Sequence, residues 1–112
     1  MIEKLDIEIK NGIYITLTAS LFYKDNILYL NNKKYQVTDE FKENLVRIIR
    51  TWESGYKDTG IIDEEEYIIT VKTDSGEEII KGRGEYPSNY HELFNLLGGL
   101  ENEWRIAKRI GF

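Results

Sequence analysis

The chain has 112 residues, of which 41% are hydrophobic and 31% charged, and its formal net charge is −5. This length fits one globular domain with one hydrophobic core, so we expect residues 1–112 to form a single domain. The sequence has no cysteine and a single histidine. Disulfides are therefore excluded, and the cysteine-rich or histidine-rich ligand sets that zinc normally requires are absent.

The first residues, MIEKLDIEIKNG, alternate charged and apolar side chains, whereas a signal peptide carries an uninterrupted apolar run. Apolar windows elsewhere in the chain are shorter than the about 20 residues that a membrane-spanning helix needs. We therefore expect a cytoplasmic protein without membrane association.

Period-two patterning dominates the first third of the chain. Leu5, Ile7 and Ile9 alternate with charged residues, which predicts a strand with one wet face. Asn11-Gly12 is a preferred hairpin dipeptide, and a second strand is expected over 13–23. The polar stretches KDN (24–26) and NNKK (31–34) predict turns around two further short strands, at 27–30 and 35–37.

The second expected strand has two different faces. Uninterrupted alternation places Ile15 and Leu17 on an aliphatic face, and Tyr14 and Phe22 on the opposite face with hydroxyl residues between them. If the helices cover the aliphatic face, Tyr14 and Phe22 form part of an exposed aromatic and polar surface. Such a surface is a candidate docking site for a protein.

A helix is expected after the meander. Thr38 is a candidate N-cap, and Asp39 and Glu40 occupy the first turn, where the helix dipole favours acidic groups. The apolar stripe of this helix follows at helical spacing and consists of Phe41, Leu45, Ile48, Ile49 and Trp52. Gly55 is positioned to end it.

The second half begins with a polar loop and continues with a hairpin. Strands are expected on both sides of a TDSG turn, and a helix after Pro87 is expected to break at Gly98-Gly99 and to be followed by a short helix around Trp104. The resulting order predicts an α+β fold: an antiparallel sheet of about five to six strands, arranged as meander, helix and hairpin, with two to three helices packed on one face.

The stretch KGRGEYPSNYHELFNLL, residues 81–97, is rich in glycine and precedes the last helical pattern. Gly82 and Gly84 are followed by Glu85, and neither a third glycine nor a Lys-Ser pair completes a phosphate-binding pattern. We therefore interpret the stretch as a corner between a strand and a helix, with Pro87 near the helix start.

Catalytic and metal-binding patterns are weak in this sequence. His91 is the single histidine, and no serine lies in a nucleophile elbow, so a small enzyme would have to use His91 together with Glu85 and nearby tyrosines. The acidic run DEEE (63–66) lacks the alternation and glycine of a calcium loop. We expect no enzymatic activity, no metal and no cofactor.

Acidic residues are concentrated in one region. Residues 53–85 hold ten acidic and four basic residues, a net charge of −6. Such a region repels phosphate backbones and favours basic protein surfaces, so we expect a protein partner with a basic surface and no direct nucleic acid binding. The candidate protein-binding residues, together with Tyr14 and Phe22, are Asp58, Asp63, Glu64, Glu65, Glu66, Asp74, Glu77, Glu78 and Glu85.

Two segments, YIITVKTDSGEEIIKGRGEYP and NYHELFNLL, resemble the C-terminal half of small bacterial α+β proteins, including the emfourin type of protease inhibitor. The resemblance covers about residues 65–98 and is one of pattern, without an inhibitory loop that transfers residue by residue. It implies an α+β fold and a role without catalysis.

These observations favour a small acidic protein-binding module, acting as an inhibitor or as an anti-defence factor of phage type. Three alternatives remain open: an emfourin-like protease inhibitor, a small enzyme that uses His91, and a structural homodimer. The chain is expected to be a monomer or a homodimer.

Overall fold

The computed structural model describes residues 2–11, 14–53, 55–56, 65–83 and 86–109. Nine elements follow one another along the chain: β1 (Ile2–Asn11), β2 (Tyr14–Phe22), β3 (Ile27–Leu30), β4 (Lys33–Gln36), α1 (Asp39–Arg50), β5 (Gly55–Tyr56), β6 (Glu65–Thr73), β7 (Gly76–Arg83) and α2 (Tyr90–Arg109).

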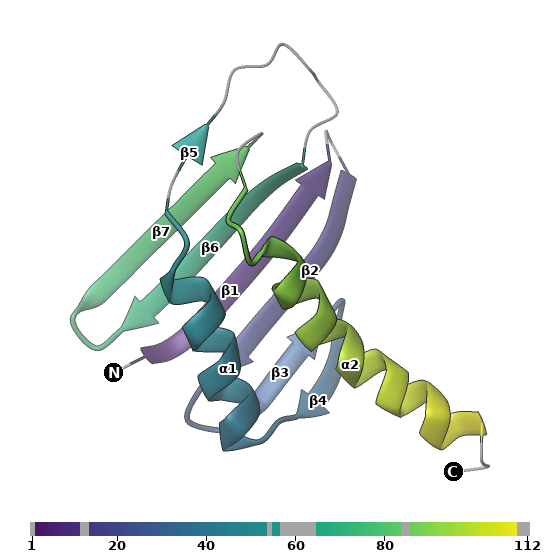
Figure 1. The fold of residues 1–112 in the computed structure, drawn as a ribbon. Coiled ribbons are helices and arrows are strands. Elements are labelled where there is room, and N and C mark those ends of the chain that lie inside the picture. Colours follow the sequence, from purple (N-terminus) through teal and green to yellow (C-terminus); the bar gives the residue numbers. More distant parts are fainter. Residues whose placement is uncertain (1, 12–13, 54, 57–64, 84–85, 110–112) are drawn as a thin grey trace.

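The strands form one sheet in the order β4-β3-β2-β1-β6-β7-β5. All neighbours are antiparallel except the two-residue β5, which pairs with the end of β7 in parallel. Both helices lie on the same face of the sheet, as Figure 1 shows. The predicted α+β class, the antiparallel sheet and the helices on one face are therefore confirmed. Strand β5 was not predicted, because two residues are too few to show a strand pattern.

Strand β1 lies at the centre of the sheet, between β2 and β6. Leu5, Ile7 and Ile9 are buried, and their partners in β6 include Val71, Ile69 and Tyr67. The charged residues between them point to the other face, as the period-two pattern predicts. β1 thus supplies the middle row of the core.

Asparagines shape the turns between β2 and β4. Asn26, Asn31 and Asn32 adopt positive φ angles of 56°, 48° and 68°, which asparagine tolerates better than most residues. The Asn31 side-chain oxygen also accepts a hydrogen bond from the backbone nitrogen of Thr18, at 3.0 Å. The turn expected at 24–26 is therefore confirmed, whereas the one expected at 31–34 is confined to Asn31 and Asn32, because β4 already begins at Lys33.

Helix α1 begins as the sequence indicates. The Thr38 hydroxyl accepts a hydrogen bond from the Phe41 backbone nitrogen at 3.1 Å, so Thr38 is the N-cap. Leu45, Ile48 and Ile49 are buried against the sheet. The helix ends earlier than Gly55, because Thr51 serves as its C-cap.

The predicted break at Gly98-Gly99 is wrong, because α2 runs without interruption through both glycines. A helical glycine costs only about 1 kcal/mol relative to alanine, and the buried Leu93 and Leu97 fix the preceding turns against the core. One continuous helix leaves no separate C-terminal helix to fold back over the core, and the packing expected for Trp104 lies outside the described side chains.

The core fills the space between the helices and the sheet. Its largest fully buried side chains come from every layer of the fold: Leu5, Ile9, Leu21, Leu28, Leu30, Leu45, Ile48, Tyr67, Ile69, Leu93 and Leu97.

Candidate functional site: the open face of the sheet

The face of the sheet that the helices leave uncovered, here called the open face, is the broadest candidate site (Figure 1). Four large hydrophobic side chains are exposed among the described residues, and three of them, Ile15, Tyr29 and Ile79, lie on this face. The exposed fractions are 59%, 39% and 50%. The fourth, Tyr86, belongs to the corner before α2.

Ile15 reaches the open face through a β-bulge. Lys10 pairs with Ile15 whereas Ile9 pairs with Leu17, so Thr16 is an extra residue in β2. The Thr16 hydroxyl donates a hydrogen bond to the carbonyl oxygen of Ile9 at 3.0 Å, which satisfies an acceptor beside the disrupted ladder. The expectation that Ile15 shares a face with the buried Leu17 is therefore wrong.

Aromatic residues form one end of the open face. Phe22 and Tyr29 meet edge to face at 5.8 Å between ring centroids, and the Lys4 amino group lies 5.1 Å from the Phe22 centroid. Phe22 is half-buried in this arrangement. Tyr14, the other predicted aromatic, pairs with Asn11 beyond the bulge, and its side chain lies outside the described part.

The centre of the open face is polar. Asp6 and Glu8 line a shallow cavity of about 310 Å³ together with the hydroxyl residues Thr18, Ser20 and Thr70. The Ser20 hydroxyl donates to Asp6 Oδ1 at 2.6 Å. The lysines on either side of the two acids also contact them, with Lys4 Nζ 3.6 Å from Asp6 Oδ2 and Lys10 Nζ 3.9 Å from Glu8 Oε1.

Charges of both signs continue across the face into β6 and β7. The register places Glu66 opposite Arg83 and Lys10, and Glu77 opposite Lys72. On β1, β6 and β7 together, the open face carries five basic and four acidic residues, which are Lys4, Lys10, Lys72, Lys81, Arg83, Asp6, Glu8, Glu66 and Glu77. The acidity of the chain is therefore not concentrated here.

The predicted acidic residues that the structure describes are divided between different surfaces. Glu65 lies at the corner with Tyr90, Glu78 is on the helix side of β7, and Asp74 is in the turn between β6 and β7. Glu66 and Glu77 lie on the open face. The remaining predicted residues, Asp58, Asp63, Glu64 and Glu85, lie outside the described residues.

The corner before α2 is built from aromatic rings. Trp52 and Tyr67 meet edge to face at 4.9 Å, and Tyr86 and Tyr90 are 4.8 Å apart. The Tyr90 hydroxyl donates to Glu65 Oε2 at 3.1 Å, and burial followed by the Glu65 charge raises the pKa of Tyr90 well above its usual range. This hydroxyl therefore stays protonated and acts as a hydrogen-bond donor.

Asn89 joins this corner to α1. Its side-chain oxygen accepts a hydrogen bond from Trp52 Nε1 at 2.8 Å, and its amide nitrogen donates to the Ile48 carbonyl at 3.2 Å and to the Thr51 hydroxyl at 3.0 Å. These contacts provide hydrogen-bond partners both for the backbone at the end of α1 and for the N–H group of the buried indole. The corner interpretation of residues 81–97 thus agrees with the described geometry.

His91 is exposed at the start of α2, with its ring 6.2 Å from that of Tyr90. Within the described ranges, no hydrogen bond joins the His91 ring to a carboxylate or a serine. Glu85, its predicted companion, lies outside them. The described geometry therefore assembles no acid–base pair around this histidine.

The described residues contain no group of three or more histidine, cysteine or acidic side chains placed to hold a metal ion. None of their helices is long and apolar enough to cross a membrane.

Comparisons with protein-family models, with curated proteins and with solved structures found no match to this chain.

Proposed function

We propose that this chain is a non-enzymatic protein-binding module that docks a partner on the open face. The observation that carries the proposal is the position of Ile15, Tyr29 and Ile79, which are exposed on the one face that no helix covers. Exposed apolar side chains around polar groups are typical of protein-interaction surfaces.

The partner is proposed to be a protein with a basic surface. The net charge of −5 attracts such a partner over distances longer than the contacts themselves. At contact, a lysine or arginine of the partner replaces Lys4 and Lys10 as the cations beside Asp6 and Glu8 in the central cavity. The aromatic pair Phe22 and Tyr29 offers the apolar contacts beside them.

This proposal favours an inhibitory role. The target would be an enzyme or, as for phage factors, a defence protein of the host. A module of this kind acts by covering a functional surface of its partner. No turnover is required, which agrees with the exposed position of His91 away from any described acid–base partner.

The test is affinity capture from the source cell with matched variants. The open-face variant combines Tyr29→Ser with Ile79→Ser, and the control is Tyr86→Ser, which truncates the fourth exposed large hydrophobic side chain, at the corner. We expect a protein that the wild-type chain and the control both retain and that the open-face variant loses. A partner that the folded open-face variant retains in full would contradict the proposal.

A further inference from the structure

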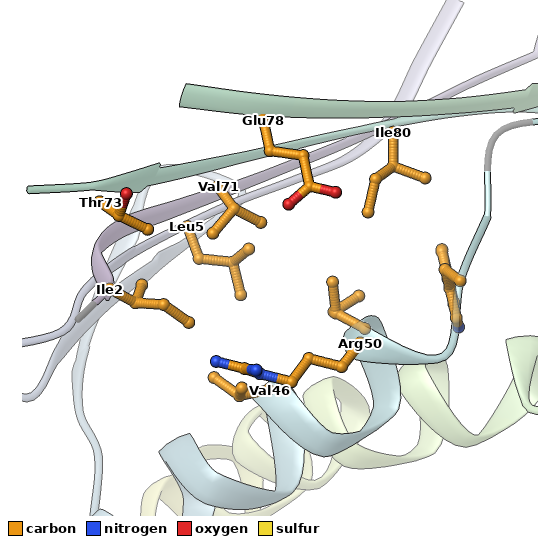
Figure 2. Close-up of a pocket in the computed structure, with 10 residues that line it drawn as sticks. Ile2, Leu5, Val46, Arg50, Val71, Thr73, Glu78 and Ile80 are labelled. Carbon is orange, nitrogen blue, oxygen red and sulfur yellow. The ribbon is translucent and has the colours of Figure 1, made fainter. Parts of the chain in front are cut away.

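A pocket of about 290 Å³ lies on the other side of the sheet, between α1 and strands β6 and β7 (Figure 2). Val71 and Ile80 form its sheet wall, and Val46 and Ile49 form its helix wall. A volume of this size is at the lower limit for small-molecule sites, and it leaves room for an apolar side chain of a partner.

The pocket depends on a second bulge. Ile2 pairs with Thr73 whereas Lys4 pairs with Lys72, so Glu3 is an extra residue in β1. The bulge turns Ile2 to the face of Leu5, and both residues line the pocket. Without it, Ile2 would share the open face with Lys4, and the end of the pocket would be missing.

Two opposite charges border the apolar walls. Arg50 lies on the helix side and Glu78 on the sheet side, and both project into the space between the layers (Figure 2). Neither takes part in an ion pair or a side-chain hydrogen bond within the part of the chain that the structure describes. The site therefore offers a cation on the helix side of the apolar pocket and an anion on its sheet side.

The same pocket borders a sheet edge. Among the described residues, the outer edge of β7 is paired only at Gly82 and Arg83, where β5 adds to it. Within the described part of the chain, residues 76–80 of β7 have β6 as their neighbour on one side only. Since backbone groups of alternate residues point to opposite edges of a strand, this stretch presents amide and carbonyl groups away from β6.

From these features we infer that the groove between α1 and β7 binds an extended peptide segment of a protein partner. The segment adds to residues 76–80 as a further strand and inserts one apolar side chain into the pocket. Side chains beside that residue supply a carboxylate to Arg50 and a cation to Glu78. This site is separate from the open face and does not depend on the function proposed there.

A second copy of the chain fits this groove less well when it pairs through its own β7. Glu78 and Ile80 are the side chains that β7 directs to the helix side, and in each copy they already form a wall of that copy's pocket. Pairing of two β7 edges would supply backbone hydrogen bonds and leave both pockets unfilled. A peptide segment satisfies the edge and the pocket together.

The probe is a display library of random linear peptides, panned against the full chain. Enriched peptides are synthesised, and amide hydrogen exchange is measured for the chain with and without each peptide. We expect enriched peptides to share an apolar residue flanked by opposite charges, and to slow exchange at alternate amides of residues 76–80. Methylation of alternate peptide amides should abolish binding, because a methylated amide cannot donate to the edge.

Charge reversal tests the pocket. Arg50→Glu and Glu78→Lys should each weaken peptide binding roughly tenfold or more, since each places a like charge against the peptide. Lys34→Glu makes the same charge change as Arg50→Glu but lies on β4, at the opposite edge of the sheet, and it should leave the affinity unchanged. Tyr29→Ser, which changes the open face on β3, far from β7 in the strand order, should also bind the peptides normally, which separates this inference from the proposed function.

Three results would overturn the inference. The first is panning that enriches no peptide, and the second is protection that appears only outside residues 76–80. The third is a concentration-dependent dimer that protects the same amides in the absence of peptide, because a second copy would then be the occupant.

Discussion

The ring of Tyr67 lies against Gly82, its partner across the β6–β7 ladder, so closely that a Cβ atom on residue 82 would overlap the ring. The Tyr67 hydroxyl continues past the glycine and donates to the Glu53 carbonyl at 2.9 Å. Gly82 therefore makes room for a buried aromatic side chain, which is a packing role and not the binding of phosphate.

Gly82→Ala is expected to destabilise the fold by about 1–3 kcal/mol, because the added methyl group must displace the Tyr67 ring from a packed corner. The matched control is Gly98→Ala in α2, where an added Cβ meets nothing within 4 Å. That variant should raise the free energy of unfolding by up to about 1 kcal/mol, since alanine is the better helix former.

Urea unfolding followed by tryptophan fluorescence measures both variants, because Trp52 is buried next to Tyr67. If Gly82→Ala proved as stable as the wild type, the close contact between ring and glycine would not exist in solution.

Elements with a strong local signal could be predicted from the sequence. The N-cap Thr38 and the buried Leu45, Ile48 and Ile49 follow from side-chain chemistry and helical spacing alone, and they occur as expected. Trp52, the last residue of the predicted stripe, is buried just after the end of the helix. The hairpin with its TDSG turn depends equally on local residues. These predictions required no knowledge of what packs against each element.

Features that depend on distant partners could not be predicted. The break expected at Gly98-Gly99 does not occur, because the packing of Leu93 and Leu97 outweighs two unfavourable helix residues. The neighbours of β1 are β2 and β6, and no local pattern specifies that order. Among the predicted acidic residues that the structure describes, Glu65 and Glu78 lie on the helix side of the sheet, whereas Glu66 and Glu77 lie on the open face, and only strand pairing reveals this division.

Asp39 should make part of the stability depend on pH. Hydrogen bonds from Asn26 and from Lys42, together with the Lys42 charge 3.3 Å away, lower the pKa of Asp39 below its ordinary value of 3.8. A group whose pKa is lower in the folded state stabilises the fold above its unfolded pKa, and that contribution is lost as the pH falls towards the folded value.

We therefore expect Asp39→Asn to lower the free energy of unfolding at pH 7, and the difference from the wild type to shrink as the pH falls below about 4. Thermal unfolding of both proteins between pH 7 and pH 2.5 measures this difference. A difference that stayed constant over the whole range would show that the Asp39 carboxylate does not carry the effect. Glu40→Gln, which removes the neighbouring acid of the same helical turn, is the control for general charge effects.

The bulge at Thr16 gives very different solvent exposure to Ile15 and Leu17, the two hydrophobic residues on either side of it in β2. Ile15 is 59% exposed and Leu17 only 9%, although strict alternation would give them the same environment. Ile15→Lys should change the free energy of unfolding by no more than about 0.5 kcal/mol, as expected for an exposed site. Leu17→Lys should cost more than about 4 kcal/mol or prevent folding, because it buries an unpaired charge.

Both lysine variants carry the same added charge, so only the environment of the residue differs between them. Circular dichroism during thermal unfolding distinguishes the outcomes, and Thr16→Val, which removes the hydroxyl bonded to Ile9 while keeping the shape, measures the support of the bulge itself. Equal destabilisation by Ile15→Lys and Leu17→Lys would mean that β2 runs without the bulge. Ile15 would then lie under the helices, and the open face would lose one of its three exposed apolar side chains.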